Sequence, residues 1–355
     1  MKRRRVHILY EYGPDLRPHG SAYIRLLRPF GYPTVSEYLD VTHGLRYDGR
    51  EADVVIVDRL WRPDISHELA SGLVEEIRRS GAQFVYALDD NLLDLPVGRR
   101  GRLTDVHVQI VRFFLVEADG VIVTTQRLRK RLEELNSDIV VVPNALDERL
   151  LIPRVPLQAG SPFGPRPKVV GYMGTFTHDE DLLMVLPALE RVCQRYPGQV
   201  ELELVGGVRR AETLEVSKAV RFKKVGPNPE EIEYPLFMLW FSSRVRWDIA
   251  ICPLRDTAFD QCKSDIKFLD YSAVGAAGIY SRVPAYESSV RHLETGLLTE
   301  NDSDAWMEAL EMLIQDDSLR IDMSQNATQY LYKQRVLARC ALDWVKRLDQ
   351  LVGGA

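Results

Sequence analysis

Long hydrophobic runs are absent from this 355-residue sequence, and no stretch is long enough to span a membrane as a helix. The opening residues, Met1 to Arg5, are basic like the start of a secretory signal, but the apolar run Val6–Tyr10 is too short for a signal core before Glu11 interrupts it. The sequence therefore predicts a cytoplasmic protein. The cluster Arg3 to Arg5 either contacts anionic lipid at the inner membrane or is ordinary solvated charge.

Cysteine is also scarce, with four residues in the whole chain. Cys193, Cys252, Cys262 and Cys340 are widely separated and form no CxxC motif or cluster with histidine. This spacing indicates neither a disulfide framework nor a zinc site, and we expect no metal. A reducing compartment such as the cytoplasm fits this usage.

A surplus of basic residues is lacking as well. The chain has 46 Lys and Arg against 51 Asp and Glu, which gives a formal net charge of -5. A general nucleic-acid-binding protein needs a basic face, so nucleic acid is not an expected partner. Any site for a phosphate group must then be built locally from a few cations and backbone amides.

The chain does have enough apolar residues, at 45%, and enough length to form two hydrophobic cores. In the first half, short β-rich runs alternate with stretches whose apolar residues recur at helical spacing. The predicted strands are Val6–Tyr10, Asp53–Val57, Phe84–Leu88, Gly120–Thr124 and Ile139–Val142, and the predicted helices are Ser66–Arg79, Thr104–Glu117 and Gln126–Leu135. Such alternation requires crossover connections, so it predicts a doubly wound parallel sheet.

A proline-rich segment then interrupts the pattern, with a composition that suits neither a helix nor a central strand. The alternation restarts after it. The predicted strands there are Lys168–Tyr172, Val200–Val205, Val220–Val225, Trp247–Cys252 and Gly278–Tyr280, and the predicted helices are Glu180–Tyr196, Asp265–Val274 and Ser303–Gln315. We therefore predict an α/β protein with a Rossmann-like domain over residues 1–152, a linker over 153–167, a second Rossmann-like domain over 168–335 and a helix over 336–355 that packs at the domain junction.

Residues that directly follow a parallel strand are candidates for ligand binding, because ligands of open α/β sheets lie beyond the carboxyl ends of the strands. Gly174, Thr175 and His178 follow the first strand of the second half and precede a helix. Gly174 allows a phosphate to approach the backbone closely, and the helix start offers unpaired N–H groups. A plain glycine turn, with His178 as a helix cap or surface residue, is the alternative.

The strongest group of candidates follows the strand that ends near Pro253. Lys263 and Ser264 precede a predicted helix that carries Lys267 and Asp270, and Ser264 or the following aspartate can cap it. The lysine ammonium and the helix amides can converge on one pyrophosphate, while Asp270 can accept hydrogen bonds from two ribose hydroxyls. The spacing alone equally allows a solvated helix face with ordinary ion pairs.

In the first half, the candidates follow three strands and face the expected cleft. Asp89 and Asp90 can orient an acceptor hydroxyl, because like-charged neighbours raise one carboxyl pKa toward the working range. Turn capping is the alternative for these aspartates, and a helix-surface position is the alternative for Arg25. The candidates for binding an acceptor are His19, Tyr23, Arg25 and Asn91, and Trp61 is a candidate for stacking on a sugar.

Several runs of residues resemble family 4 glycosyltransferases. Lys263–Gly275, Ile279–Ser281 and Thr295–Leu298 resemble the donor-binding region of that family, and Gly171–Asp181 resembles the opening of the same domain. The runs Val85–Asn91, Ala118–Val121 and Val142–Asp147 resemble members that build bacterial surface polysaccharides. The resemblance covers nearly the whole chain. It implies a GT-B fold, a nucleoside diphosphate sugar donor, no required metal or cofactor, and retention of anomeric configuration.

The chain departs from the family pattern at two places. Many relatives carry two glutamates, the second facing ribose and the first facing the donor sugar; here the second matches Asp270 but the first falls at Cys262. A thiol cannot replace a carboxylate as a charged acceptor, so sugar recognition must differ or shift to Asp256, Asp260 or Asp265. The basic pair that many relatives place after the glycine turn is replaced by Thr177–Asp181, so Lys263 and Lys267 would bear more of the phosphate charge.

These expectations combine in one function. The sequence predicts a glycosyltransferase that moves a sugar from a nucleoside diphosphate sugar to a glycan or lipid-linked acceptor in bacterial polysaccharide or glycoconjugate synthesis. Lys263, the Ser264 amide and the Gly174–Thr175 backbone are the expected stabilisers of the departing diphosphate. A sugar-nucleotide epimerase is one alternative, and a non-catalytic GT-B subunit of a polysaccharide assembly complex, favoured by Cys262, is the other.

Overall fold

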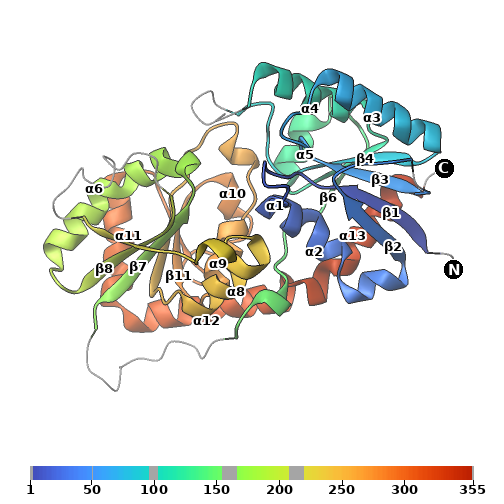
Figure 1. Ribbon diagram of the computed structural model, residues 1–355. Helices are drawn as coiled ribbons and strands as arrows, with labels where there is room; N and C mark the ends of the chain where they lie inside the picture. The colour runs from blue at the N-terminus through green and yellow to red at the C-terminus, as the bar shows by residue number, and fades with distance from the viewer. Residues whose placement is uncertain (1–2, 50, 96–102, 154–165, 208–219, 354–355) are drawn as a thin grey trace.

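A computed structural model of the protein describes residues 3–49, 51–95, 103–153, 166–207 and 220–353. The chain forms two α/β lobes, each built on a six-stranded parallel sheet with helices packed against it (Figure 1). The predicted pair of doubly wound sheets is confirmed. Residues 154–165 of the predicted linker lie outside the described residues. Within the described ranges, no helix is both long and apolar enough to cross a bilayer.

The N-terminal sheet has the strand order β2-β1-β3-β4-β5-β6, and every neighbouring pair is parallel. β3 is buried along its whole length, because helices cover both faces of such a sheet, and its sequence is accordingly a continuous apolar run that ends in aspartate. The elements are β1 Arg4–Leu9, α1 Gly20–Ala22, the π-helical turn η1 Tyr23–Leu27, α2 Arg28–Phe30, η2 Pro33–Glu37, β2 Leu39–Gly44, β3 Val54–Asp58, α3 His67–Ser80, β4 Gln83–Leu88, α4 Asp105–Glu117, β5 Gly120–Val123, α5 Gln126–Leu132, β6 Ile139–Val141 and η4 Glu148–Leu150.

β2 has no counterpart among the predicted elements. It pairs only with β1, so it forms one edge of the sheet, and most of its residues are partly or fully exposed. An edge strand that buries little surface does not need an apolar run, and the sequence Leu39–Gly44 has none. Its strand conformation therefore follows from pairing with β1 and is not visible in the local pattern.

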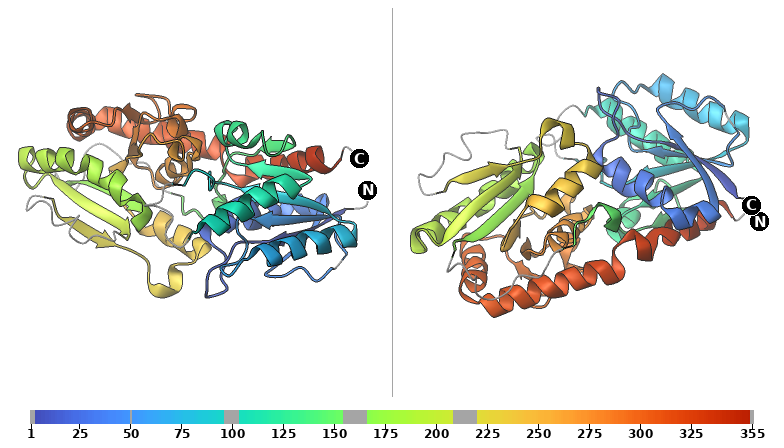
Figure 2. Two further views of the ribbon diagram at one scale, coloured as in Figure 1. Left: turned by 90° about the horizontal axis from the view of Figure 1, so that it is seen from above. Right: turned by 60° about the horizontal axis from the view of Figure 1, so that its bottom comes forward.

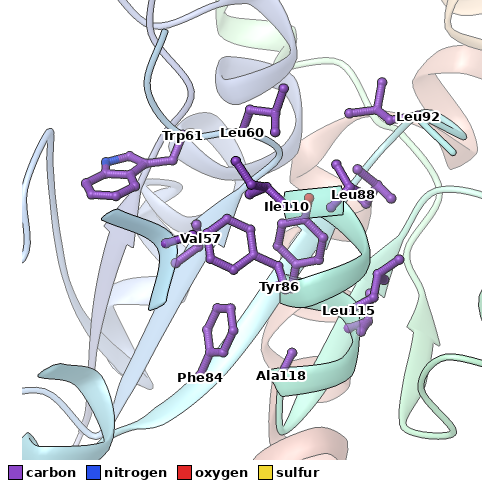
Figure 3. Close-up of a cluster of buried hydrophobic side chains, with 14 of the residues drawn as sticks. Val57, Leu60, Trp61, Phe84, Tyr86, Leu88, Leu92, Ile110, Leu115 and Ala118 are labelled. Atoms are coloured by element: carbon purple, nitrogen blue, oxygen red, sulfur yellow. The ribbon is translucent and has the colours of Figure 1, made fainter. Parts of the chain in front are cut away.

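One face of the N-terminal sheet packs against α3 and α4 through a cluster that includes Phe84, Tyr86, Ile110 and Leu115 (Figure 3). Trp61 belongs to the same cluster. Its side chain is 5% exposed, and its indole Nε1 donates a hydrogen bond to the Leu45 carbonyl at 2.8 Å. The prediction that Trp61 stacks on a sugar is therefore wrong, because the ring is part of the core.

The C-terminal sheet has the order β12-β11-β10-β7-β8-β9, again with all pairs parallel. From β7 the chain adds β8 and β9 on one side and then β10, β11 and β12 on the other, so the direction of strand addition reverses between β7 and β10. Open sheets of this kind leave a crevice for ligands at such a point. The elements are β7 Lys168–Gly174, η5 Phe176–His178, α6 Asp179–Arg195, β8 Val200–Gly206, β9 Phe222–Val225, η6 Pro229–Glu231, α8 Tyr234–Arg244, β10 Ile249–Cys252, η7 Asp260–Cys262, α9 Ile266–Ala273, β11 Ala277–Ser281, α10 Pro284–Glu287, β12 Leu297–Thr299, α11 Ser303–Gln315, α12 Asp317–Gln334 and α13 Leu337–Val352.

Two consecutive helices lead the chain back from the C-terminal lobe to the N-terminal lobe (Figure 2). α12 contacts α9 and β11, whereas α13 buries its apolar stripe against the second face of the N-terminal sheet. Trp344, on this stripe, is fully buried and donates from Nε1 to the Arg25 carbonyl at 2.8 Å. The chain therefore crosses between the lobes at Arg335 and Val336, and α13 covers the N-terminal sheet.

Candidate active site

A cavity of about 180 Å³ lies between the two domains, beyond the carboxyl ends of β7 and β10. Both domains contribute to its wall, which includes Tyr172, Met173, Pro253 and Asn144. Seven of the site residues predicted from the sequence also line it: Arg25, Asp89, Asp90, His178, Lys263, Ser264 and Lys267. The structure thus brings most of the predicted donor residues and the two aspartates to one place.

Lys263 and the start of α9 form the cationic side of the cavity. Lys263 Nζ lies 3.3 Å from Asp90 Oδ1, and the Asn144 side-chain amide donates to Ser264 Oγ at 2.8 Å. Asp265 occupies the N-cap position of α9, but its carboxylate pairs with Arg335 at 2.6 and 2.9 Å and makes no capping hydrogen bond. The positive end of α9 is therefore not neutralised by the aspartate that precedes it.

Lys267 and Asp270 lie one turn apart on α9. Among the described residues, Lys267 has no hydrogen bond or ion pair, and burial lowers its pKa. Asp270 is 6% exposed, and its Oδ1 has no hydrogen-bond partner in the described part of the chain. Burial raises the pKa of Asp270 to about 6, although the nearby Lys267 opposes this shift. A buried carboxylate oxygen without a donor calls for a ligand or water that supplies one.

His178 is held by a fully buried aspartate that the sequence alone did not single out. His178 Nδ1 lies 2.8 Å from Asp181 Oδ2, and Asp181 Oδ1 accepts a hydrogen bond from the Arg255 backbone at 3.2 Å. Burial lowers the pKa of His178, with a further contribution from the charge of Lys263. The His178 side chain makes no capping hydrogen bond to α6, so the cap interpretation does not hold. Its place in the cavity wall agrees with a ligand contact.

Gly174 ends β7 and Thr175 follows it, and neither residue lines the cavity. A Cβ atom at Gly174 would lie 2.6 Å from the Tyr172 hydroxyl, so packing alone accounts for the glycine. The Thr175 hydroxyl forms a hydrogen bond with the Thr177 hydroxyl at 2.8 Å. The side chain of Tyr172 fills the space beside this turn, and the predicted phosphate contact of the turn stays a prediction.

Asp89 and Asp90 face an arginine that was not among the predicted residues. Arg59 Nη1 lies 2.6 Å from Asp89 Oδ1 and 3.6 Å from Asp90 Oδ2, and Arg59 Nε lies 2.8 Å from Glu11 Oε2. Its backbone has φ of 47°, a conformation that non-glycine residues seldom adopt. Residues in this conformation concentrate at functional sites. Arg59 directly follows β3, so its position after a predicted strand is the feature of the sequence that could have marked it as a candidate site residue.

The acceptor candidates fall into different environments. Arg25 is 3% exposed, and its Nη1 donates to the Val142 carbonyl and to Asn144 Oδ1, both at 2.7 Å. Burial lowers the pKa of Arg25 to about 10. Its guanidinium therefore supports the end of β6 from inside the domain, and the helix-surface alternative is wrong. Asn91 is buried and donates to Asp94 Oδ2 at 2.8 Å.

Tyr23 and His19 lie away from the cavity. Tyr23 donates a hydrogen bond to Glu233 of the other domain and stacks on Tyr234 with ring centroids 6.0 Å apart. His19 Nδ1 lies 3.4 Å from Glu11 Oε2, and His19 lines a second groove of about 570 Å³ that also includes Tyr234. These two residues lie where the first loop of the N-terminal domain meets the start of α8.

Cys262, at the position of the missing glutamate, packs with Phe259 into the core of the N-terminal domain. It is 5% exposed, its carbonyl accepts a hydrogen bond from Thr125 Oγ1 at 3.0 Å, and its Sγ lies 3.7 Å from Asn91 Nδ2. The expected replacements do not line the cavity. Instead, the carboxylate of Asp256 interacts with Gln261, that of Asp260 with Thr257, and that of Asp265 with Arg335.

Positive charge at the cavity comes from Lys263, Lys267 and the buried Arg25, with Arg59 behind the aspartates. No group of three or more His, Cys, Asp or Glu side chains in the described part of the chain is arranged to hold a metal ion. An anion that enters the cavity therefore meets side-chain ammonium groups and the amides at the start of α9.

Comparison with known proteins gives one family match and many structural neighbours. Residues 167–316 match the family model described as glycosyl transferases group 1. A curated relative, the D-inositol 3-phosphate glycosyltransferase of Corynebacterium urealyticum, is 28% identical over 177 residues, which is 46% of this chain and 38% of that protein. The aligned region thus spans well under half of the relative.

Solved structures match over the whole length. Sucrose-phosphate synthase from Thermosynechococcus elongatus has a TM-score of 0.69 at 16% sequence identity, and the match covers 99% of this chain and 100% of the synthase chain. A glycosyltransferase from Rickettsia africae has a TM-score of 0.66 at 11% identity, with 100% of both chains covered. Anabaena HepE in complex with UDP and glucose has a TM-score of 0.64 at 14% identity, with 98% and 99% covered. The protein therefore has the GT-B fold, and the group 1 match in its C-terminal domain supports a glycosyltransferase.

Proposed function

We propose that this protein is a family 4 glycosyltransferase that transfers a sugar, most simply a hexose, from a nucleoside diphosphate sugar to a glycan or lipid-linked acceptor. One observation carries the proposal: Lys263, Lys267 and the uncapped start of α9 meet at the interdomain cavity. One turn beyond Lys267 on the same helix lies Asp270, whose buried Oδ1 has no hydrogen-bond partner among the described residues. Two ammonium groups and helix amides suit a diphosphate. A carboxylate lacking donors suits the hydroxyls of a ribose.

The proposed chemistry retains the anomeric configuration. The acceptor oxygen forms a bond to the anomeric carbon on the side from which the diphosphate leaves, and the hydroxyl proton departs with the diphosphate. Charge then develops on the leaving group, where Lys263 and the positive end of α9 can stabilise it. Asp89 and Asp90 on the opposite wall hold the acceptor hydroxyl. The two lysines supply the positive charge, so no metal or cofactor is required in this proposal.

Three more specific proposals concern the donor nucleotide, the acceptor and the place in the cell where the reaction occurs. UDP-sugars are the first donors to test, because Anabaena HepE, which shares the fold, was solved with UDP-glucose. The acceptor is proposed to be an intermediate of bacterial polysaccharide or glycoconjugate synthesis. The reaction would take place in the cytoplasm, with peripheral contact between Arg3–Arg5 and the inner membrane.

A thermal-shift panel tests the donor site directly. UDP, GDP, ADP, CDP and TDP, each with and without a sugar, are added to the purified protein. A ligand at a hundred times its Kd stabilises the native state by about 2.7 kcal/mol, so the correct nucleotide raises the unfolding temperature. Transfer to acceptor fractions is then measured with and without EDTA, and the anomeric configuration of the product is read by NMR. No shift with any nucleotide would refute the proposal.

A non-catalytic GT-B subunit is the second candidate, because a specific observation favours it. Cys262 replaces the donor-sugar glutamate and is packed into the N-terminal core, so it does not face a sugar. A protein that binds nucleotide but neither hydrolyses the sugar nucleotide nor transfers its sugar would support this candidate.

A further inference from the structure

The lysine assigned to the diphosphate already has an anionic partner. Lys263 Nζ lies 3.3 Å from Asp90 Oδ1, which belongs to the other domain. The ammonium also lies 4.6 Å from the centroid of the Phe259 ring. The side chains of Lys263 and Asp90 are 18% and 26% exposed, so water screens this pair only in part. Lys263 therefore links the two domains.

Asp90 is the least tightly held carboxylate in its group. Arg59 lies 2.6 Å from Asp89 and 2.8 Å from Glu11, but 3.6 Å from Asp90. Burial raises the pKa of Asp90, but the positive charges of Lys263 and Arg59 together lower it by more. The pKa of Asp90 therefore lies below its ordinary value. Asp90 thus stays ionised while Lys263 is beside it. Loss of Lys263 would leave Asp90 with the Arg59 guanidinium, at 3.6 Å, as its ion-pair partner.

A diphosphate and Asp90 compete for the same ammonium. A phosphate oxygen within hydrogen-bond distance of Lys263 would stand within a few ångströms of the Asp90 carboxylate, and like charges this close repel each other strongly. Lys267 lies in the same cavity and forms no ion pair within 4 Å in the described part of the chain, although the charge of Asp270 acts on it, so it adds a second ammonium for the incoming diphosphate. The diphosphate also gains the amides at the start of α9, which Asp90 does not contact.

We propose that Asp90 takes the place of the donor diphosphate as the partner of Lys263, and that donor binding transfers Lys263 to the diphosphate and releases Asp90 to the acceptor hydroxyl. This inference rests on the proposed function of the cavity. It makes Asp90 a positioning residue that couples the two substrates.

Substitution of Asp90 by asparagine tests the competition, because it removes the charge and keeps the shape. Binding of UDP and of inorganic pyrophosphate is measured by calorimetry. Removal of a partly exposed ion pair of about 1 kcal/mol should tighten UDP binding about fivefold in Asp90→Asn. Asp94→Asn is the matched control, because it makes the same change four positions further along. Its partners are Arg131, at 2.5 and 2.8 Å, and Asn91, and it does not line the cavity.

A double-mutant cycle shows whether the effect acts through Lys263. In the Lys263→Ala background, Asp90→Asn should no longer tighten binding, because no ammonium is left to compete for. The inference is overturned if wild type binds UDP and Asp90→Asn binds it no more tightly, if Asp94→Asn gives the same gain, or if the gain persists without Lys263. If wild type binds pyrophosphate and none of the five nucleoside diphosphates of the panel, or binds no ligand at all, the proposed function fails and the inference with it.

Discussion

Arg335 is expected to hold the donor side of the site in place, and its removal should destabilise the protein. Its guanidinium donates to both oxygens of Asp265 at 2.6 and 2.9 Å and to the Asn144 carbonyl at 2.8 and 3.0 Å. It thereby joins the end of α12, the N-cap of α9 and the loop after β6. Arg335→Met keeps an unbranched apolar stem but removes the guanidinium and with it these bonds.

The exposure of the pair sets the size of the effect. The side chains of Arg335 and Asp265 are 13% and 8% exposed. Breaking a buried pair by removing one partner costs about 3 to 5 kcal/mol, and we expect the lower end here, about 3 kcal/mol, because Asp265 can turn to cap α9 instead. For a chain of this size that corresponds to a fall of about 4 °C in Tm if both domains unfold together. The same turn would place a carboxylate at the anion site and weaken UDP binding.

Urea unfolding followed by tryptophan fluorescence, together with calorimetric UDP binding, measures both effects. Arg339→Met is the control, because Arg339 lies on the exposed face of α13 and its side chain has no hydrogen bond or ion pair to another described residue. The double variant Arg335→Met, Asp265→Asn should regain much of the lost stability, because it leaves no uncompensated carboxylate. If Arg335→Met were no less stable than Arg339→Met, the reasoning from the buried pair would be refuted.

Three further predictions concern catalysis, pH and the core. Lys263→Ala should lower turnover on the order of a hundredfold, about 3 kcal/mol of transition-state stabilisation, whereas the lost ion pair with Asp90 should lower the stability by no more than about 1 kcal/mol; unaltered turnover would remove Lys263 from the mechanism. Burial, with Glu11 and Asp89 nearby, raises the pKa of Asp58 to about 8, so the folded state keeps a proton that the unfolded chain releases near pH 4. The stability linked to that proton is lost as the pH rises from about 4 to about 8, so Asp58→Asn should lose less stability than wild type over this window in urea titrations; parallel curves would contradict this. Trp344→Ala should cost about 3 to 5 kcal/mol and expose α13 to limited proteolysis, because the ring is 1% exposed in the core; full protease resistance would contradict it.

The sequence alone determines the elements whose signal is local. The predicted helix Ser303–Gln315 is observed with the same bounds, and the predicted strands of both sheets are observed with small shifts at their ends. Alternation of strands and helices leaves little choice but parallel sheets, and it places the candidate residues after strands. For this reason the sequence marks Lys263 and Lys267 as candidates, and the structure brings both to the interdomain cavity.

Only the tertiary structure decides which of these residues meet, and in what state of charge. Lys263 and Asp90 are 173 positions apart, and no local pattern encodes their ion pair. The same holds for the burial of Arg25, for the support of His178 by Asp181, and for the insertion of Cys262 into the other domain's core. Periodicity reports which face of an element is buried against its own sheet. The distances across the cleft depend on how two separately built domains pack, and so does the pKa of every group that this packing buries.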